Sequence, residues 1–64
     1  MANKKLLRAE KNRDAWIELY AAAVRSYIDH LQRGNYYQAN AVAAIIEDTR
    51  KQVEQACIEF EEAH

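Results

Sequence analysis

Proline is missing from this chain of 64 residues, and glycine and cysteine each occur once, as Gly34 and Cys57. A chain without proline lacks the residue that most strongly interrupts helices. The single cysteine excludes a disulfide within the chain, and a lone thiol is typical of a reducing compartment. A domain this short is only marginally stable by itself, so we expect it to gain stability from a second chain.

Long apolar runs are lacking as well. The best candidate, YYQANAVAAII at residues 36–46, is shorter than the about 20 residues that span a bilayer, and it contains Gln38 and Asn40. The charged first stretch, MANKKLLRAEKNRD, has no apolar core of the kind found in signal peptides. The sequence therefore predicts a soluble, cytoplasmic protein that makes no membrane contact.

Residue patterns that carry catalysis or bind metals are equally scarce. Ser26 and His30 share a helix face, but a continuous helix offers no oxyanion hole beside them. Glu61 and His64 have the spacing of one half of a di-iron site, and the other half is missing. There is no CxxC pair, no HxxxH pair and no glycine-rich phosphate loop. We therefore predict a protein that is not an enzyme and uses no metal or cofactor.

Good helix formers fill the chain on both sides of Gly34, and apolar residues recur there every three or four positions. This spacing indicates two amphipathic helices. The predicted core or dimer residues are Ile17, Val24, Ile28, Leu31, Val42, Ile46, Val53 and Phe60. In the second helix they belong to a heptad row formed by Val42, Ile46, Thr49, Val53, Ala56, Phe60 and Ala63.

The sequence RGN at residues 33–35 predicts a tight turn between the helices. Gly34 suits the left-handed position that ends a helix, and Asn35 with Gln38 resembles a capping box that begins the next one. We predict one all-α domain over residues 1–64, with helices over about 4–33 and 36–62 and the turn at 33–35. A turn this short makes the two helices antiparallel neighbours.

Charge is distributed unevenly between the two chain ends. Residues 1–14 contain five basic and two acidic residues, whereas residues 54–64 contain four acidic residues and no Lys or Arg. Because a hairpin brings these ends together, we expect their charges to pair across its open end. The alternative interpretation is a cationic patch that binds nucleic acid.

The first helix has more apolar surface than one neighbour covers. Its segment AWIELYAAAV, residues 15–24, is apolar on nearly every side and is interrupted only by Glu18. A helix of this kind requires more than one packing partner. We therefore predict that two hairpins form a homodimeric four-helix bundle, and the alternative is a monomer with an apolar surface.

The size, the hairpin and the predicted dimer resemble the plasmid-encoded RNA-one-modulator (Rop) proteins. Lys5, Asn12 and Trp16 are spaced by seven and four, as are a lysine, an asparagine and a phenylalanine of that family, and Gln38-Ala39 also matches. The resemblance implies a dimeric four-helix bundle whose first helices bind paired RNA loops. Lys5, Asn12 and Trp16 are accordingly the candidate RNA-binding residues.

Tyr36 and Tyr37 follow the turn directly, at the tip of the predicted hairpin. Tyrosine is enriched at protein interfaces because it combines apolar area with a hydroxyl group. We predict that they contact a protein partner; the alternative is that they cap the end of the bundle. The favoured function is thus a small non-catalytic interaction or regulatory protein, similar in size and composition to accessory proteins of temperate bacteriophages. The alternative is a Rop-like RNA-binding regulator.

Overall fold

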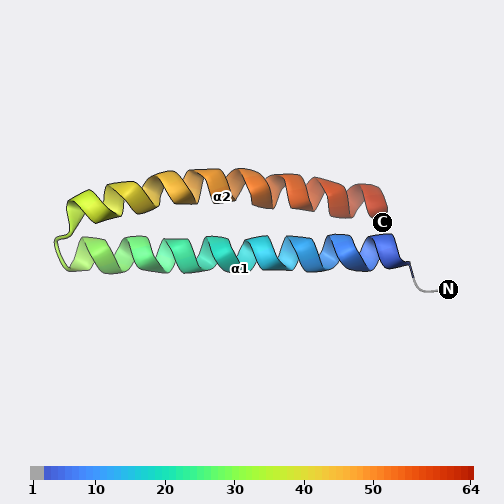
Figure 1. Ribbon diagram of the computed structural model, residues 1–64, viewed down its shortest axis with the longest axis horizontal. Coiled ribbons are helices and arrows are strands. Elements are labelled where there is room, and N and C mark those ends of the chain that lie inside the picture. The colour runs from blue at the N-terminus through green and yellow to red at the C-terminus, as the bar shows by residue number, and fades with distance from the viewer. Residues whose placement is uncertain (1–2) are drawn as a thin grey trace.

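The computed structural model describes residues 3–64 and contains two long helices joined by a short turn (Figure 1). Helix α1 spans Lys4–Gln32 and helix α2 spans Tyr36–Ala63. The helices lie side by side and antiparallel, so the start of α1 and the end of α2 lie at the same, open end of the hairpin (Figure 1). The predicted all-α hairpin is confirmed, and each helix ends within one residue of its predicted bound. Residues 1–2 of the predicted domain lie outside the described residues.

The turn is a Schellman motif built on Gly34. The Asn35 N–H donates to the carbonyl of His30 at 2.9 Å, and the Gly34 N–H donates to that of Leu31 at 3.1 Å. These bonds satisfy carbonyl groups that the end of α1 leaves free, but they require a left-handed residue. Gly34 has a φ of 76°, as predicted, because glycine adopts this conformation without a steric penalty.

The two helices begin differently. At the start of α1 the side-chain oxygen of Asn3 accepts a hydrogen bond from the Leu6 N–H at 3.0 Å, which makes it a true N-cap. Asn35 precedes α2, but its side chain makes no capping hydrogen bond. The backbone φ and ψ of Asn35, −84° and 66°, differ from the extended backbone conformation that a residue adopts when its side chain caps a helix. The capping box predicted for Asn35 and Gln38 is therefore wrong.

The helices pack along a row of buried and half-buried residues on each of them, which we call the hairpin seam. In α2 these residues are Ala39, Val42, Ile46, Thr49, Val53, Ala56, Phe60 and Ala63. In α1 they are Leu6, Ala9, Arg13, Trp16, Tyr20, Ala23, Tyr27 and His30. Both rows alternate steps of three and four, which is the heptad pattern of a coiled coil. The predicted row of α2 is confirmed.

Very little of the seam is completely covered. Within residues 3–64 the only buried residues are Ala39, Thr49 and Ala56, all of them small. The Thr49 hydroxyl donates to the carbonyl of Ile45 at 2.7 Å, so its polar atom keeps a partner inside the contact. A pair of helices whose buried residues are this small has little hydrophobic stabilisation.

The hairpin is also long and thin. It measures 52 × 15 × 10 Å, and its radius of gyration is 14.8 Å, compared with about 11 Å for a compact chain of this length. It exposes 5091 Å² of surface, whereas a compact monomer of this mass exposes about 4200 Å². The excess of about 900 Å² shows that the two helices cover each other incompletely.

Candidate interaction surfaces

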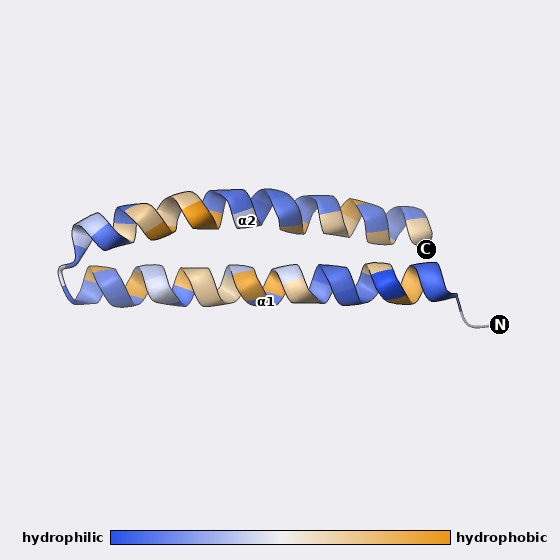
Figure 2. Cartoon of the chain, viewed as in Figure 1, coloured by the Kyte–Doolittle hydropathy of each residue, from blue (hydrophilic) through white to orange (hydrophobic). Residues whose placement is uncertain are grey.

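A second apolar row runs along α1 beside the hairpin seam. It consists of Ile17, Ala21, Val24, Ile28 and Leu31, and we call it the second stripe. Each member follows a seam residue by one position, so the stripe is rotated by about 100° from the seam around the helix axis. Figure 2 shows hydrophobic residues along α1 from its middle toward the turn, whereas much of the second half of α2 is hydrophilic.

Part of the set predicted to lie in the core or the dimer contact lies outside the hairpin seam. Ile17, Ile28 and Leu31 are 43%, 48% and 38% exposed, so they do not lie between the two helices. The predicted α1 row is thus one position away from the seam, and Val24 is half-buried beside it. Both rows have helical spacing, and α1 is apolar enough to offer either one. Val42, Ile46, Val53 and Phe60 do lie on the seam.

Sequence reasoning missed two polar members of the seam, Arg13 and His30. The Arg13 guanidinium lies 4.2 Å from the centre of the Phe60 ring, in a cation–π contact between the helices, and it also pairs with Asp14 at 3.0 Å. His30 fills the seam near the turn, where its Nδ1 atom is buried without a hydrogen-bond partner. A search for apolar residues alone misses both. The sequence did contain one indication for Arg13: it lies three positions before Trp16, which is the spacing between consecutive seam residues.

The opposite face of the hairpin has a smaller apolar area. Lys5 and Asn12 of α1 line one groove together with Glu59 of α2. Each of these residues directly precedes a seam residue, so the positions just before the seam lie on the same face in both helices. Leu19 is two heptads after Lys5, and Ile45 is two heptads before Glu59, so both belong to this face, where each is 56% exposed. Two isolated large side chains on different helices make a patch rather than a continuous row.

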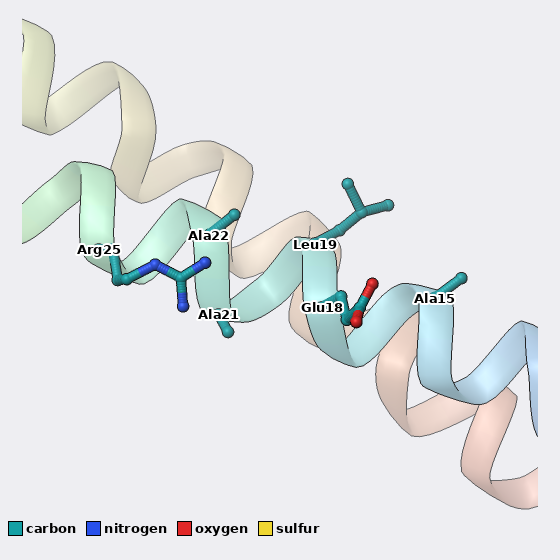
Figure 3. Close-up of a pocket in the computed structure, with 6 residues that line it drawn as sticks. All are labelled: Ala15, Glu18, Leu19, Ala21, Ala22 and Arg25. Carbon is teal, nitrogen blue, oxygen red and sulfur yellow. The ribbon is translucent and has the colours of Figure 1, made fainter.

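A shallow groove of about 770 Å³ lies on the outer surface of α1 (Figure 3). Its lining residues are Ala15, Glu18, Leu19, Ala21, Ala22 and Arg25, all from this one helix. Figure 3 shows them around the outside of α1, with α2 behind it. The groove exists because the alanine side chains along its floor are short, and Glu18 and Arg25 are the charged residues of its lining. The groove has no catalytic arrangement of nucleophile and base.

Tyr36 and Tyr37 stand in the first turn of α2, at the closed end of the hairpin. They are 67% and 85% exposed, so neither ring is tucked against α1. Tyr36 lies one heptad before Ala43, which directly follows the seam residue Val42. Tyr36 and Ala43 therefore face the same side of the hairpin as the second stripe. Tyr37 projects about 100° further around the helix.

The basic end of α1 does not form the predicted ion pairs across the hairpin. None of the four ion pairs found in residues 3–64 joins α1 to α2; they are Arg13–Asp14, Arg33–Asp29, Arg50–Glu47 and Arg50–Glu54. Lys4 and Lys11 occupy the heptad position farthest from α2, and Arg13 is held by Phe60 and Asp14. The charges at the open end are therefore neighbours without direct contacts.

Those charges are nevertheless better placed for the neighbouring helix than for their own. The first turn of α1 contains no acidic residue, and the last turn of α2 contains no basic one. Lysines near the positive end of α1 and glutamates near the negative end of α2 oppose the dipoles of their own helices. In the antiparallel hairpin each group lies beside a helix end of opposite sign, which offsets part of this penalty.

The three candidate RNA-binding residues do not form one exposed set. Lys5 and Asn12 are exposed and line the same groove of about 430 Å³ with Arg8 and Glu59. Trp16 is a half-buried residue of the hairpin seam. A base that stacked on Trp16 would have to reach into the contact between the helices.

A charged row occupies α2 beyond Ala43. Arg50 pairs with Glu47 at 2.6 Å and also with Glu54, so one guanidinium joins two carboxylates on the helix surface. The hydrogen bond from Arg50 and its positive charge lower the pKa of Glu47, and the same contact raises the pKa of Arg50. This row lies beside the second stripe and limits the apolar face to the half of the hairpin nearer the turn.

Within the described residues, no group of three or more His, Cys, Asp and Glu side chains comes together as a metal site. Neither α1 nor α2 combines the length and the apolar character that a membrane-spanning helix requires. Comparison with protein-family models, with curated proteins and with solved structures gives no match in any of the three. The resemblance to Rop proteins remains a prediction from the sequence.

Proposed function

We propose that this chain is a small non-catalytic interaction protein with a regulatory role, and that two copies associate into a four-helix bundle. One observation carries the proposal: large apolar side chains are exposed, while within residues 3–64 only three small residues are fully buried. The exposed set is Leu7, Ile17, Leu19, Ile28, Leu31, Tyr36, Tyr37, Ile45 and Ile58. A partner that covers part of this set adds hydrophobic stabilisation that a chain of this size otherwise lacks.

The amount of uncovered surface supports association. The hairpin exposes about 900 Å² more than a compact monomer of its mass, and a standard interface buries about 800 Å² per partner. One interface of ordinary size therefore accounts for the excess. The two tyrosines lie at the tip, beyond the middle of the hairpin, and their exposure of 67% and 85% is the basis for their proposed role as contacts with a further protein.

Sedimentation equilibrium tests the association. At micromolar concentration we expect a mass of about twice 7.4 kDa, together with a melting temperature that rises with protein concentration. A monomer mass with a melting temperature that is independent of concentration would contradict the proposal.

A pull-down tests the tip. We expect a protein retained by the wild-type chain to be lost with the double variant Tyr36→Ser/Tyr37→Ser. Ile58→Ser serves as the control, because Ile58 is also a large exposed apolar residue, at 50%, and lies on the distant part of α2. Equal retention by both variants would remove the tyrosines from the proposal.

RNA binding is a second candidate, favoured by the exposed cations at the start of α1. Lys4, Lys5, Arg8 and Lys11 are all exposed, and none of them forms an ion pair within residues 3–64. A gel-shift assay with structured RNA at low and moderate salt decides the matter, because binding to phosphates weakens steeply as salt rises. The absence of a shift at low salt would exclude this candidate.

A further inference from the structure

We infer that the second stripe is the dimer face, and that a second copy packs against it with α1 antiparallel to α1 about a two-fold axis near Val24. The inference rests on the proposed homodimer and adds which face of α1 forms the interface and how the two α1 helices are oriented. The occupant is another copy of this chain, and three properties of the stripe identify it.

The first property is position. In a four-helix bundle each helix contacts two neighbours in directions roughly at right angles. The second stripe is rotated by about 100° from the hairpin seam, which is the direction needed. It extends without interruption from Ile17 to Leu31, over about 21 Å of helix. The face that carries Leu19 and Ile45 has no comparable row.

The second property is self-complementarity. A two-fold axis near Val24 brings Ile17 of one chain against Leu31 of the second copy, and Ala21 against Ile28 of the second copy. A small residue thus meets a large one on each side of the axis, as interdigitated packing requires. A symmetric dimer uses the same surface on both chains, so a stripe that complements itself needs no other patch.

The third property is charge. Glu10 and Asp14 continue the row of the second stripe toward the open end of the hairpin, and both are exposed. In a parallel dimer they would meet the same carboxylates of the second copy and repel them. In the antiparallel dimer Asp14 comes level with the turn of the second copy. The following helix has no acidic residue in its first turn and no side-chain cap from Asn35, so a carboxylate is favourable there.

Disulfide trapping tests the face and the direction together. Three variants carry a single cysteine, Ile17→Cys, Leu31→Cys or Leu19→Cys, each with Cys57→Ala. Pairs of variants of different mass are unfolded, mixed, refolded and oxidised. We expect the mixed Ile17→Cys and Leu31→Cys pair to form far more disulfide than either variant with itself, because only antiparallel chains bring these positions within bonding distance. Leu19→Cys is the control, because Leu19 lies on the opposite face and is more exposed than either Ile17 or Leu31.

The outcomes separate the inference from the proposal on which it rests. A dimer mass with stronger self-pairing of Ile17→Cys and of Leu31→Cys indicates a parallel dimer and overturns the inference alone. A dimer mass with strongest trapping at Leu19→Cys places the interface on the other face and also overturns it. A monomer mass with no trapping overturns both.

A charge variant gives an independent result with a definite sign. Glu10→Gln/Asp14→Asn should raise the dimer dissociation constant about fivefold, because each helix start loses a favourable negative charge. The control Asp48→Asn, on the opposite face of α2, should leave it unchanged. A dissociation constant that falls instead would show that the carboxylates repel one another, and would overturn the antiparallel arrangement.

Discussion

The two helices have nearly the same length but distribute their apolar residues differently. Helix α2 has a single heptad row, and beyond Ala43 its flank carries the charged residues Glu47, Arg50 and Glu54. Helix α1 has two adjacent rows, of which the hairpin covers one. A helix with one apolar row has one apolar face to bury, whereas a helix with two rows has two. Variants that act on one row and spare the other test this difference.

The largest effect is expected on the seam of α2. Ala56 is 1% exposed, so Ala56→Glu would bury an unpaired carboxylate at a cost of about 3–5 kcal/mol. A domain of this size is stable by only about 3–5 kcal/mol, so cooperative thermal unfolding should disappear from circular dichroism. The exposed neighbour Gln55→Glu is the control and should change stability by about 0.5 kcal/mol or less.

The second stripe should respond almost as strongly, but through association. Ile28→Asp removes two isoleucine side chains from each proposed dimer, at a cost of about 3 kcal/mol of association free energy. Sedimentation equilibrium should then give a monomer. Ile45→Asp, at a site of similar exposure on the opposite face, should leave the dimer intact. Equal behaviour of the two variants would show that the second stripe has no special role.

These two rows also show how far the sequence determines the fold. The absence of proline, the single glycine and the heptad row of α2 were sufficient to predict both helices, the turn and the α2 contact. The α1 contact was predicted less well, because Ile17, Val24 and Ile28 have the same helical spacing as the true seam and are more apolar. Which row is covered depends on how Arg13, Trp16 and Tyr20 fit against α2, and composition does not contain that information.

The candidate site was predicted in part. The position of Tyr36 and Tyr37 at the tip follows from the turn, and their exposure in the structure agrees with a surface role. The predicted pairing of charges across the open end does not occur. The hairpin determines which charged groups are neighbours, but the direction of each side chain around its helix decides whether they touch.

A smaller effect is expected at the turn, which both helices share. Gly34→Ala should destabilise the protein by about 1 kcal/mol, because a Cβ atom is penalised at a φ of 76°. No other atom lies within 4 Å of that added Cβ atom, so the penalty is one of backbone conformation alone. A thermal melt at fixed concentration measures it, and a higher melting temperature would contradict the hairpin turn.

The two helix starts should differ in the same assay. Asn3→Ala removes a side-chain cap and should cost about 1 kcal/mol, whereas Asn35→Ala removes no capping hydrogen bond and should cost only a few tenths. Chemical denaturation resolves this difference. A larger loss for Asn35→Ala would mean that its side chain caps α2 in solution.

The smallest effect concerns the charged row of α2. Because Arg50 lowers the pKa of Glu47, this pair stabilises the folded state at a pH above the ordinary carboxyl pKa, and the contribution is lost as the pH falls through the lowered value. In Arg50→Gln the pKa of Glu47 should rise toward its ordinary range. Carboxyl chemical shifts followed by NMR during acid titration measure it, with exposed Glu18 as the internal control.

The central claim, that the second stripe of α1 contacts a second copy, is tested most directly by isotope-filtered NMR. Equal amounts of labelled and unlabelled protein are refolded together, so that only cross-peaks between chains are observed. We expect cross-peaks between the methyl groups of Ile17 and Leu31 and between those of the two Val24 residues. Cross-peaks between chains that involve Leu19 and Ile45 instead, or none at all at a concentration where the mass is that of a dimer, would contradict it.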